Sequence, residues 1–287
     1  MRTRRVIGAM SGTSLDGLDL ALVEIEGEGL AMRARLIRGR SASLGALEPR
    51  LRAAATEAPL RAREFAELGR DFALLHAQEC ERLAGGERVD LISAHGQTIL
   101  HAPPLSWQLL QPQPIAAALK CRVICDLRSA DLAEGGQGAP LTPLADWILF
   151  RNAQPRVIIN LGGFANATGL PSANEPAEQA LAAIRGADLC ACNQWLDLAA
   201  RRMLGEPFDR DGASAEQGEA CPAITGRLVA SLTAMTARGR SLGTGDELDR
   251  VLNLVAPSAT STPPRSVAQN ALASMTREIG RASCRER

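Results

Sequence analysis

Short apolar runs that end in glycine-rich polar turns recur along this chain, with helical periodicity between them. Residues 6–10 form such a run before a turn cluster at 11–17, and strands are expected to follow at 18–25 and 30–37. From 60 to 83 the apolar residues recur every three or four positions, which predicts an amphipathic helix packed on a sheet. The alternation of strands and helices predicts an α/β fold.

The same alternation continues along the chain. Further strands are expected at 89–93, 107–110, 123–125, 157–160 and from 167 onward. Further helices are expected from 114 and at 142–150, 193–204, 228–237 and 266–275, with loops at 132–140 and 161–166. Because the glycine-rich hairpin near residue 160 has the same layout as the first one, we expect a duplicated architecture whose second half begins near residue 155.

The charge of the chain is balanced. Among 287 residues, 32 Lys and Arg residues offset 32 Asp and Glu residues, which argues against nucleic-acid binding. No apolar run approaches the roughly 20 residues of a membrane-spanning helix, and the N-terminus lacks the apolar core of a signal peptide. We therefore expect a cytoplasmic protein that does not bind membranes.

The few lysine and cysteine residues limit how the chain can bind phosphate or metal. Lys120 is the only lysine, and no Walker-type loop surrounds it. A phosphate ligand would therefore be held by backbone amides, arginine or a metal ion. The seven cysteines are scattered and odd in number, so we expect reduced thiols. The spacing of Cys190 and Cys192 does not suit a zinc site, and we interpret both as small buried residues.

The turn between the first two expected strands offers consecutive backbone amides, hydroxyl groups and two carboxylates. Amides in such a turn can form an anion-binding nest, and a nearby carboxylate can hold Mg²⁺ against a phosphate chain. Asp16 is the candidate ligand for that ion. The alternative interpretation is a solvated hairpin turn that is rich in Ser, Asp and Gly for conformational reasons alone.

Polar residues follow two more of the expected strands. His95 and Gln97 flank a glycine after the strand at 89–93, where the imidazole could donate a hydrogen bond to a ligand or transfer a proton. Asp126 and Arg128 follow the strand at 123–125, and a carboxylate next to a guanidinium suits a sugar or phosphate. The alternatives are a histidine that ties its loop to the backbone and a surface ion pair.

Taken together, these segments resemble the ordered motifs of the anhydro-N-acetylmuramic acid kinases. The matching residues are 10–17 (MSGTSLDG), 94–98 (AHGQT), 126–128 with 135–141 (DLR and GGQGAPL), 160–166 (NLGGFAN) and 208–212 (FDRDG). The resemblance is specific from residue 6 to residue 218 and thin from 228 to 275. It implies duplicated actin/hexokinase/Hsp70-like (ribonuclease H-like) α/β domains with a cleft between them. The first domain would span 1–153, and a partial second domain would span 154–276.

The family opens the 1,6-anhydro bond of its sugar with water and phosphorylates O6 from ATP, which gives N-acetylmuramic acid 6-phosphate in peptidoglycan recycling. For this chain the resemblance implies that activity, with ATP and Mg²⁺ as cofactors and anhydro-N-acetylmuramic acid as substrate. By position, the ATP-binding residues would be Gly12, Thr13, Ser14, Leu15, Asp16, Gly17, Leu18, Asp19, Gly162 and Gly163, with Asp16 also at the metal. The sugar-binding residues would be His95, Gln97, Asp126, Arg128 and Asn193.

The family's catalytic aspartate opens a motif that aligns with residues 188–193 (DLCACN). The resemblance therefore implies that Asp188 is the base that takes a proton from the attacking water. The family motif has Gly-Pro-Gly/Ala where this chain has Cys190, Ala191 and Cys192. Because side chains restrict a turn that uses glycine dihedrals, this departure could displace Asp188 and reduce activity.

The C-terminal end departs from the family as well. Family chains continue for several tens of residues past Met275, so we expect an incomplete second domain with poor solubility or weak ATP affinity. Residues 277–287 resemble a translated sequencing adapter, and we expect a non-native tail there. The alternatives to an active kinase are an inactive fragment that at most binds the sugar or a partner, and another ATPase of the superfamily, such as an acetate-kinase-like or Hsp70-like one. The family is generally dimeric, which makes a homodimer one further expectation.

Overall fold

The computed structural model describes residues 3–56 and 58–236. The chain divides into two compact units, and each is considered by itself. The first comprises the chain up to Arg151 together with Pro176–Glu178, and the second comprises Asn152–Glu175 and the chain from Gln179 onward. Both units mix helices and strands, which confirms the predicted α/β class.

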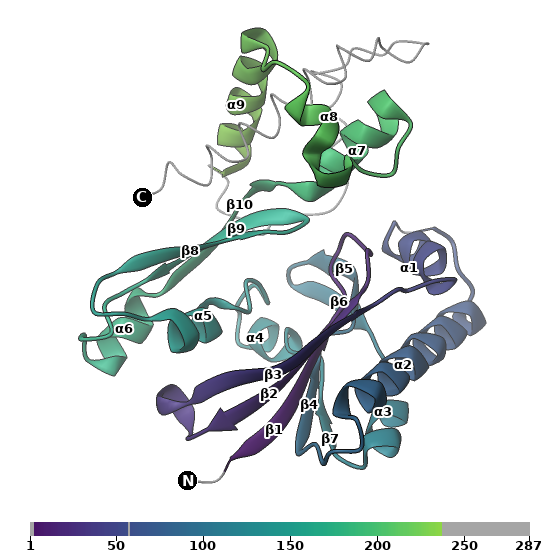
Figure 1. Ribbon diagram of the computed structural model, residues 1–287, viewed down its shortest axis with the longest axis vertical. Helices are drawn as coiled ribbons and strands as arrows, with labels where there is room; N and C mark the ends of the chain where they lie inside the picture. The colour runs from purple at the N-terminus through teal and green to yellow at the C-terminus, as the bar shows by residue number, and fades with distance from the viewer. Residues whose placement is uncertain (1–2, 57, 237–287) are drawn as a thin grey trace. The chain divides into compact units, whose positions relative to one another are not determined.

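The first unit is built on a five-stranded mixed sheet with the strand order β3-β2-β1-β4-β7 (Figure 1). Its strands are β1 (Arg4–Met10), β2 (Leu18–Glu26), β3 (Arg33–Ala42), β4 (Leu91–Ala94) and β7 (Arg122–Ile124). The first three form an antiparallel meander, and β4 and β7 run parallel to β1. Because parallel strands end at the same edge of a sheet, the residues after β1 and after β4 come out side by side.

Helices α2 (Ala62–Ala84) and α3 (Pro112–Leu119) pack against this sheet and against each other (Figure 1). At the start of α2, the carboxylate of Glu64 accepts a hydrogen bond from the N–H of Arg61 (2.6 Å), and Gly85 ends the helix in the left-handed conformation. The remaining elements of the unit are η1 (Gly29–Ala31), α1 (Leu47–Ala55), the hairpin of β5 (Gln97–Ala102) and β6 (Leu105–Leu109), α4 (Ser129–Ala133) and α5 (Pro143–Phe150).

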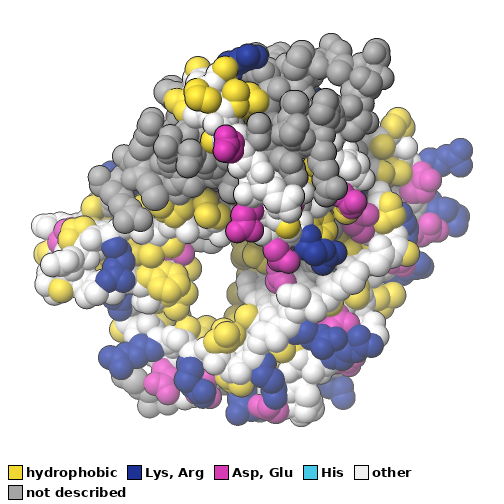
Figure 2. Space-filling view, turned by 45° about the horizontal axis from the view of Figure 1, so that its top comes forward, with side chains coloured by type: hydrophobic (Ala, Val, Ile, Leu, Met, Phe, Trp, Pro, Cys, Tyr) yellow, Lys and Arg dark blue, Asp and Glu magenta, His cyan; other side chains and the backbone are white. Residues whose placement is uncertain are grey.

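Acidic and basic side chains lie interspersed on the face of the molecule drawn in Figure 2. The surface ion pairs of this unit include Arg35 with Glu24 (2.7 Å) and Arg52 with Glu48 (2.6 Å). Exposed pairs of this kind contribute little to stability, typically about 0–1 kcal/mol each. The hydrophobic core must therefore supply most of the stability of the unit.

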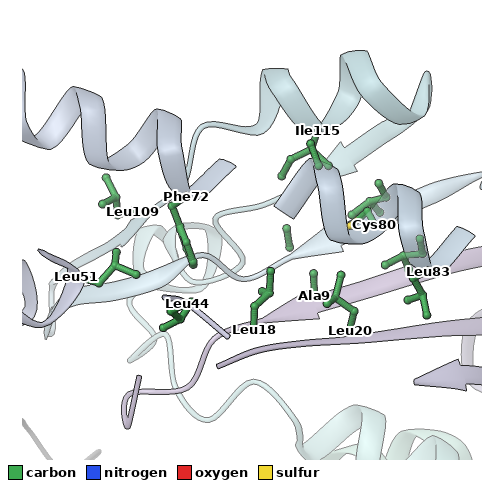
Figure 3. Close-up of a cluster of buried hydrophobic side chains, with 14 of the residues drawn as sticks. Ala9, Leu18, Leu20, Leu44, Leu51, Phe72, Cys80, Leu83, Leu109 and Ile115 are labelled. Carbon is green, nitrogen blue, oxygen red and sulfur yellow. The ribbon is translucent and has the colours of Figure 1, made fainter. Parts of the chain in front are cut away.

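That core lies between the sheet and α2. Figure 3 shows Phe72, Cys80 and Leu83 of α2 pointing toward side chains of the sheet such as Leu18 and Leu20. Phe72, Cys80 and Leu18 are fully buried. Complete burial of one such side chain contributes about 1.5–3 kcal/mol. This packing fixes the strand ends from which the candidate site is built.

The second unit contains a three-stranded antiparallel sheet with the order β10-β9-β8. Its elements are β8 (Arg156–Leu161), β9 (Phe164–Leu170), β10 (Arg185–Ala191), α7 (Asn193–Leu204), η2 (Arg210–Gly212), α8 (Ala213–Glu216) and α9 (Pro222–Thr236), and α6 (Ala177–Ala183) begins within the short segment grouped with the first unit. Trp195 of α7 is a large, fully buried side chain of its core, which also includes Leu189, Cys190, Met203 and Leu228. The meander β8-β9-β10 has the same strand order and antiparallel pairing as β1-β2-β3.

Several predicted boundaries were wrong. The expected strand at 30–37 begins at Arg33, because Gly29–Ala31 form a 3₁₀ turn, and it runs on to Ala42. The expected turn at 161–166 consists of Gly162 and Gly163 alone, since Phe164 already pairs as part of β9. The helix expected at 228–237 begins at Pro222, whose fixed φ suits a first helical position. The helix expected at 266–275 lies outside the described residues.

Other elements differ from the prediction or were not predicted from the sequence. The expected loop at 132–140 includes the end of α4. Hairpin strand β5, strand β10 and helix α1 were not predicted. In the part of the chain that the structure describes, no helix is long and apolar enough to cross a membrane.

Candidate functional site

The turn between β1 and β2 is anchored by two buried leucines. Leu15 and Leu18 are 3% and 0% exposed, so any contact these two residues make with a ligand would come from their backbone. Leu15 adopts the left-handed conformation at φ 60°, and its N–H donates to the carbonyl of Gly12 (3.2 Å). By contrast, Thr13, Asp16 and Asp19 are exposed. The leucines thus hold the turn while the side chains of Thr13, Asp16 and Asp19 face solvent.

Backbone amides of this turn are open to a ligand. Within the described part of the chain, the N–H groups of Gly12, Ser14 and Asp16 have no hydrogen-bond acceptor. The hydroxyl of Ser11 is buried and also lacks a partner among the described residues. Buried polar groups are normally satisfied, so an orphaned hydroxyl beside free amides fits a site that binds a polar ligand.

Two carboxylates at the turn differ in their surroundings. Asp19 accepts a hydrogen bond from the hydroxyl of Ser41, whereas the Asp16 carboxylate has no partner among the described residues. Mg²⁺ is usually held by one or two protein carboxylates together with waters and substrate phosphates. A single exposed carboxylate beside open amides fits that donor set, and Asp16 rather than Asp19 is the available one.

Gln97 joins the turn to the segment that follows β4. Its side chain is 1% exposed, and Nε2 donates to the carbonyl of Gly12 (3.4 Å) and to that of Thr98 (3.5 Å). The amide oxygen of Gln97 has no partner among the described residues. The structure therefore brings together two segments that the sequence assigned separately, one to ATP phosphate and one to sugar.

His95 is held in one tautomer at the end of β4. Its backbone N–H donates to the carbonyl of Ala9 (3.0 Å), and its ring Nδ1 donates to the carbonyl of Gly96 (2.9 Å). A carbonyl can only accept, so the proton lies on Nδ1 and the neutral ring keeps a lone pair on Nε2. Burial lowers the pKa of His95, and the positive charge of Arg128 acts in the same direction. His95 is therefore a neutral acceptor at pH 7.

Asp126 and Arg128 begin a loop that is tied to itself. The carboxylate of Asp126 accepts from the hydroxyl of Ser129 (2.7 Å), and Arg128 donates to the carbonyl of Gly138 (2.6 Å). The N–H of Gly138 in turn donates to Asp131 (2.7 Å). A side chain at Gly136 would collide with the carboxylate of Asp131. These contacts fix the loop on which Asp126 and Arg128 lie.

Three motif residues hold left-handed backbone conformations that are unusual for residues other than glycine. They are Leu15 (φ 60°), Asp126 (φ 54°) and Asp211 (φ 55°), and the one other such residue in the described part of the chain ends a helix. Strain of this kind costs about 1–3 kcal/mol per residue and gathers at functional sites. The strained backbone at Leu15 and Asp126 favours a functional over a purely structural interpretation of the motifs that contain these two residues.

The second unit places Asp188 on a strand. Asp188 lies in β10 opposite Asn166, and a bulge follows it before Cys190. Cys190 thus continues the strand and Cys192 is the residue before α7, where the family motif implies a glycine-containing turn. Both thiols are buried in the core, which confirms their interpretation as small buried residues. Burial raises the pKa of Cys190 to about 12, so its thiol stays protonated.

The glycine turn of the second unit lies against the start of α7. The carbonyl of Gly163 accepts from Cys192 (2.9 Å) and Gln194 (3.3 Å), and the carbonyl of Gly162 accepts from Asn193 (3.0 Å). The structure thus brings Gly162 and Gly163 together with Asn193, a cluster that the sequence did not predict. Because these amides already have protein acceptors, the first turn of α7 is used to fix the strand that carries Asp188.

The last motif, FDRDG, is a helix cap. The two carboxylate oxygens of Asp209 accept from the N–H groups of Ser214 and Ala215 (both 2.9 Å) at the start of α8. Arg210 lies over the ring of Phe208, with 5.4 Å between the guanidinium carbon and the ring centroid. These contacts give the motif a structural role.

The fold and these turns define a mixed α/β protein whose strand ends carry the candidate ligand-binding residues. The model of the family "Anhydro-N-acetylmuramic acid kinase" matches residues 4–256. The chain therefore belongs to the anhydro-N-acetylmuramic acid kinase family.

Relatives that carry this name come from several bacteria. One from a Picosynechococcus species is 40% identical over 227 residues, which are 75% of this chain and 59% of the relative. One from Synechococcus sp. (strain WH7803) is 35% identical over 280 residues, or 90% of this chain and 72% of the relative. One from Chromohalobacter salexigens is 40% identical over 245 residues, or 78% of this chain and 61% of the relative. The chain thus spans less than two thirds of the length of two of these relatives.

Proposed function

We propose that this chain has the activity after which its family is named, ATP-dependent phosphorylation of anhydro-N-acetylmuramic acid. Water would add to the anomeric carbon, the bond from that carbon to O6 would break, and O6 would receive the terminal phosphoryl group of ATP. The products would be ADP and N-acetylmuramic acid 6-phosphate. The observation that carries the proposal is the turn at 11–17, in which the N–H groups of Gly12, Ser14 and Asp16 have no acceptor among the described residues and the Gly12 carbonyl is bound by Gln97.

The residues of the first unit would bind the two substrates. The amides at Gly12, Ser14 and Asp16 would bind ATP phosphates, and the Asp16 carboxylate would hold Mg²⁺. His95 would accept a hydroxyl proton of the sugar at Nε2, since its Nδ1 is already bound to Gly96. Gln97, Asp126 and Arg128 would bind the sugar with it, and positioning would account for much of the rate.

In the second unit, Asp188 would be the general base for the attacking water. Its strand is held by the amides of α7, which bind the glycine turn at 162–163 and so limit movement of the carboxylate. Asn193 at the first position of α7 would contact the sugar.

We further propose that the two units are duplicated actin-like domains divided near residue 153. The matching meanders β1-β2-β3 and β8-β9-β10, each with a glycine-containing turn after its first strand, support this. Gly162 and Gly163 would then be the counterparts of the first turn at the nucleotide. We also propose that the protein is located in the cytoplasm and that it forms a homodimer.

An assay of the purified chain tests the activity. Incubation with ATP, Mg²⁺ and anhydro-N-acetylmuramic acid in ¹⁸O-labelled water should give ADP and a sugar phosphate that carries the label at the anomeric hydroxyl. Absence of ADP production above the rate without sugar would contradict the proposed function.

Asp188→Asn tests the assigned base. The substitution keeps the shape of the side chain but removes its basicity, so kcat should fall by about 10²–10⁴-fold while ATP still binds. The matched control is Glu178→Gln, which neutralises an exposed carboxylate on α6 and should leave kcat unchanged. Near-normal turnover by Asp188→Asn would show that another group activates the water.

A further inference from the structure

A bulge in β3 gathers arginines on one face of the sheet edge. Leu22 of β2 pairs with Arg38, but the next residue, Val23, pairs with Leu36, so Ile37 is the extra residue. Arg40 pairs with Leu20. Residues directly opposite each other in an antiparallel pair share a face. Arg38 and Arg40 therefore lie on the face of Leu20 and Leu22, which is the face that packs on α2.

These arginines line a cavity with the last turn of α2. The cavity has a volume of about 310 Å³ and is lined by Arg38, Gly39, Arg40, Arg82 and Leu83. Its volume is at the lower end of the range of small-molecule sites, and it opens widely to solvent. Three guanidinium groups line this cavity and no carboxylate does, which distinguishes it from the mixed charges elsewhere on the surface. The phosphate turn at 11–17 and the sugar segment at 95–97 do not contribute to it.

The carboxylates behind the cavity neutralise only part of this charge. Glu79 is 2% exposed and accepts from Arg40 (2.5 Å) and Arg82 (2.5 Å). Glu87 accepts from Arg38 (2.6 Å) and Arg5 (2.5 Å), and the hydrogen bond from Arg38 is the largest cause of its lowered pKa. Three guanidinium groups line the cavity and two carboxylates lie behind them, which leaves an excess of positive charge at the cavity.

The arginines also keep hydrogen-bond donors. Arg40 uses Nε for Glu79, and Arg82 uses Nη1. Within the described part of the chain, both Nη groups of Arg40 and the Nε and Nη2 of Arg82 have no acceptor. Arg38 likewise uses only Nη2, for Glu87 and for the carbonyl of Ala84 (3.2 Å). A guanidinium fixed by one ion pair and free on its other edge is suited to a second, planar or tetrahedral oxyanion.

We propose that the Arg38–Arg40–Arg82 cavity is a second anion site that binds the dianionic phosphate group of a small molecule. The N–H donors left over on the three arginines match the three terminal oxygens of a phosphate monoester better than the two oxygens of a carboxylate. The site belongs to the first unit alone, and it does not depend on the kinase activity proposed above. A kinase-inactive chain should bind phosphate here equally well.

Arginine-detected NMR tests the proposal on the whole chain. The Nε–H signals of Arg38, Arg40 and Arg82 are followed while inorganic phosphate or glucose 6-phosphate is added at constant ionic strength. Saturable shifts of these signals are expected, and acetate should bind at least about tenfold more weakly because it carries one charge. If glucose 6-phosphate binds more tightly than inorganic phosphate, a phosphorylated metabolite is the source; equal affinity indicates free phosphate.

Variants locate the binding. Arg82→Gln should weaken phosphate binding by at least about tenfold, since a hydrogen bond to a charged group is lost. Arg38→Gln should have the same effect and leaves both partners of buried Glu79 in place. The matched control is Arg35→Gln on the same strand, whose partner is Glu24 and which lies outside the cavity. Shifts that grow linearly without saturation, or equal weakening by Arg35→Gln, would overturn the proposal and leave an ion-pair cluster that protects the sheet edge.

Discussion

At the scale of single residues, His76 is a polar side chain in the hydrophobic core, and only one of its two ring nitrogens has a hydrogen-bond partner among the described residues. The side chain is 0% exposed, and Nδ1 donates to the carbonyl of Phe72 (2.9 Å), while Nε2 has no partner among the described residues. Its ring meets that of Phe72 edge-on, with centroids 4.4 Å apart. Burial lowers the pKa of His76 to about 4, although the Phe72 hydrogen bond opposes the shift. The imidazole is therefore neutral in the folded protein.

His76 should make stability depend on pH. Between its ordinary pKa near 6.5 and about 4, the unfolded chain binds a proton that the folded protein does not, so this contribution to stability is present above 6.5 and is lost as the pH falls toward 4. We expect His76→Leu to remove about 2 kcal/mol of the stability loss between pH 7 and pH 5. Urea denaturation of both proteins at pH 7 and at pH 5 measures this difference in the free energy of unfolding. Leu68→Met, a non-titrating change on the same helix, should shift stability equally at both; the same result for His76→Leu would contradict the assignment.

At the scale of elements, the corner between β4 and β5 shows how backbone geometry sets the candidate site. Gly96 lies between His95 and Gln97 at φ 75°, and a Cβ there would come within 3.0 Å of the carbonyl oxygen of Leu109. The left-handed backbone strains any other residue, and the carbonyl belongs to β6, which cannot move easily. One glycine thus orients both of these candidate side chains, His95 and Gln97.

Gly96→Ala should therefore affect both stability and function. Strain and the close contact predict a loss of about 1–3 kcal/mol in the free energy of unfolding, together with weaker ATP binding because the Gln97 to Gly12 hydrogen bond is disturbed. Gly8→Ala in β1 is the matched control, since a Cβ at Gly8 meets nothing within 4 Å. Denaturation and calorimetric ATP titration of both variants provide the measurement. Equal effects of the two substitutions would remove Gly96 from its proposed role.

How well elements could be predicted from sequence depended on whether their signal is local. Helix α7 was predicted with its observed bounds, Asn193–Leu204, because its apolar residues repeat with helical spacing. The bulge at Ile37 and strand β10 were missed because only pairing with a neighbouring strand defines them. Hairpin β5–β6 was half missed for the same reason.

The residues of the candidate site were likewise predictable only where their signal is local in the sequence. The glycine turn and its polar residues were visible because glycine, serine and aspartate mark turns locally. Local sequence could not show that Gln97 reaches Gly12, that Asp209 caps a helix, or that Gly162 and Gly163 accept the amides of α7. Ser11 was not predicted as a site residue, because only the burial of its hydroxyl without a partner among the described residues distinguishes it from other serines near glycine. These facts depend on contacts between distant parts of the chain.

At the scale of the whole molecule, each unit has its own hydrophobic core. One includes Phe72 of α2 and the other Trp195 of α7, and among the residues that the structure describes none belongs to both clusters. A tryptophan reports on each: Trp107 lies 5.1 Å from Phe65 between ring centroids, and Trp195 is 1% exposed. Chains of more than one domain commonly depart from two-state unfolding, so separate cores predict separate transitions.

Core substitutions in single-tryptophan variants can test this. Two background chains are needed, one that keeps only Trp107 and one that keeps only Trp195. In the Trp107 chain, Phe72→Ala should lower the free energy of unfolding by about 3–5 kcal/mol. It should leave the midpoint reported by Trp195 unchanged. Met203→Ala in the second core should do the reverse, with a loss of about 2–5 kcal/mol seen by Trp195. If either substitution moves both urea midpoints equally, the chain unfolds as one cooperative body, and the energetic independence inferred from the two cores is wrong.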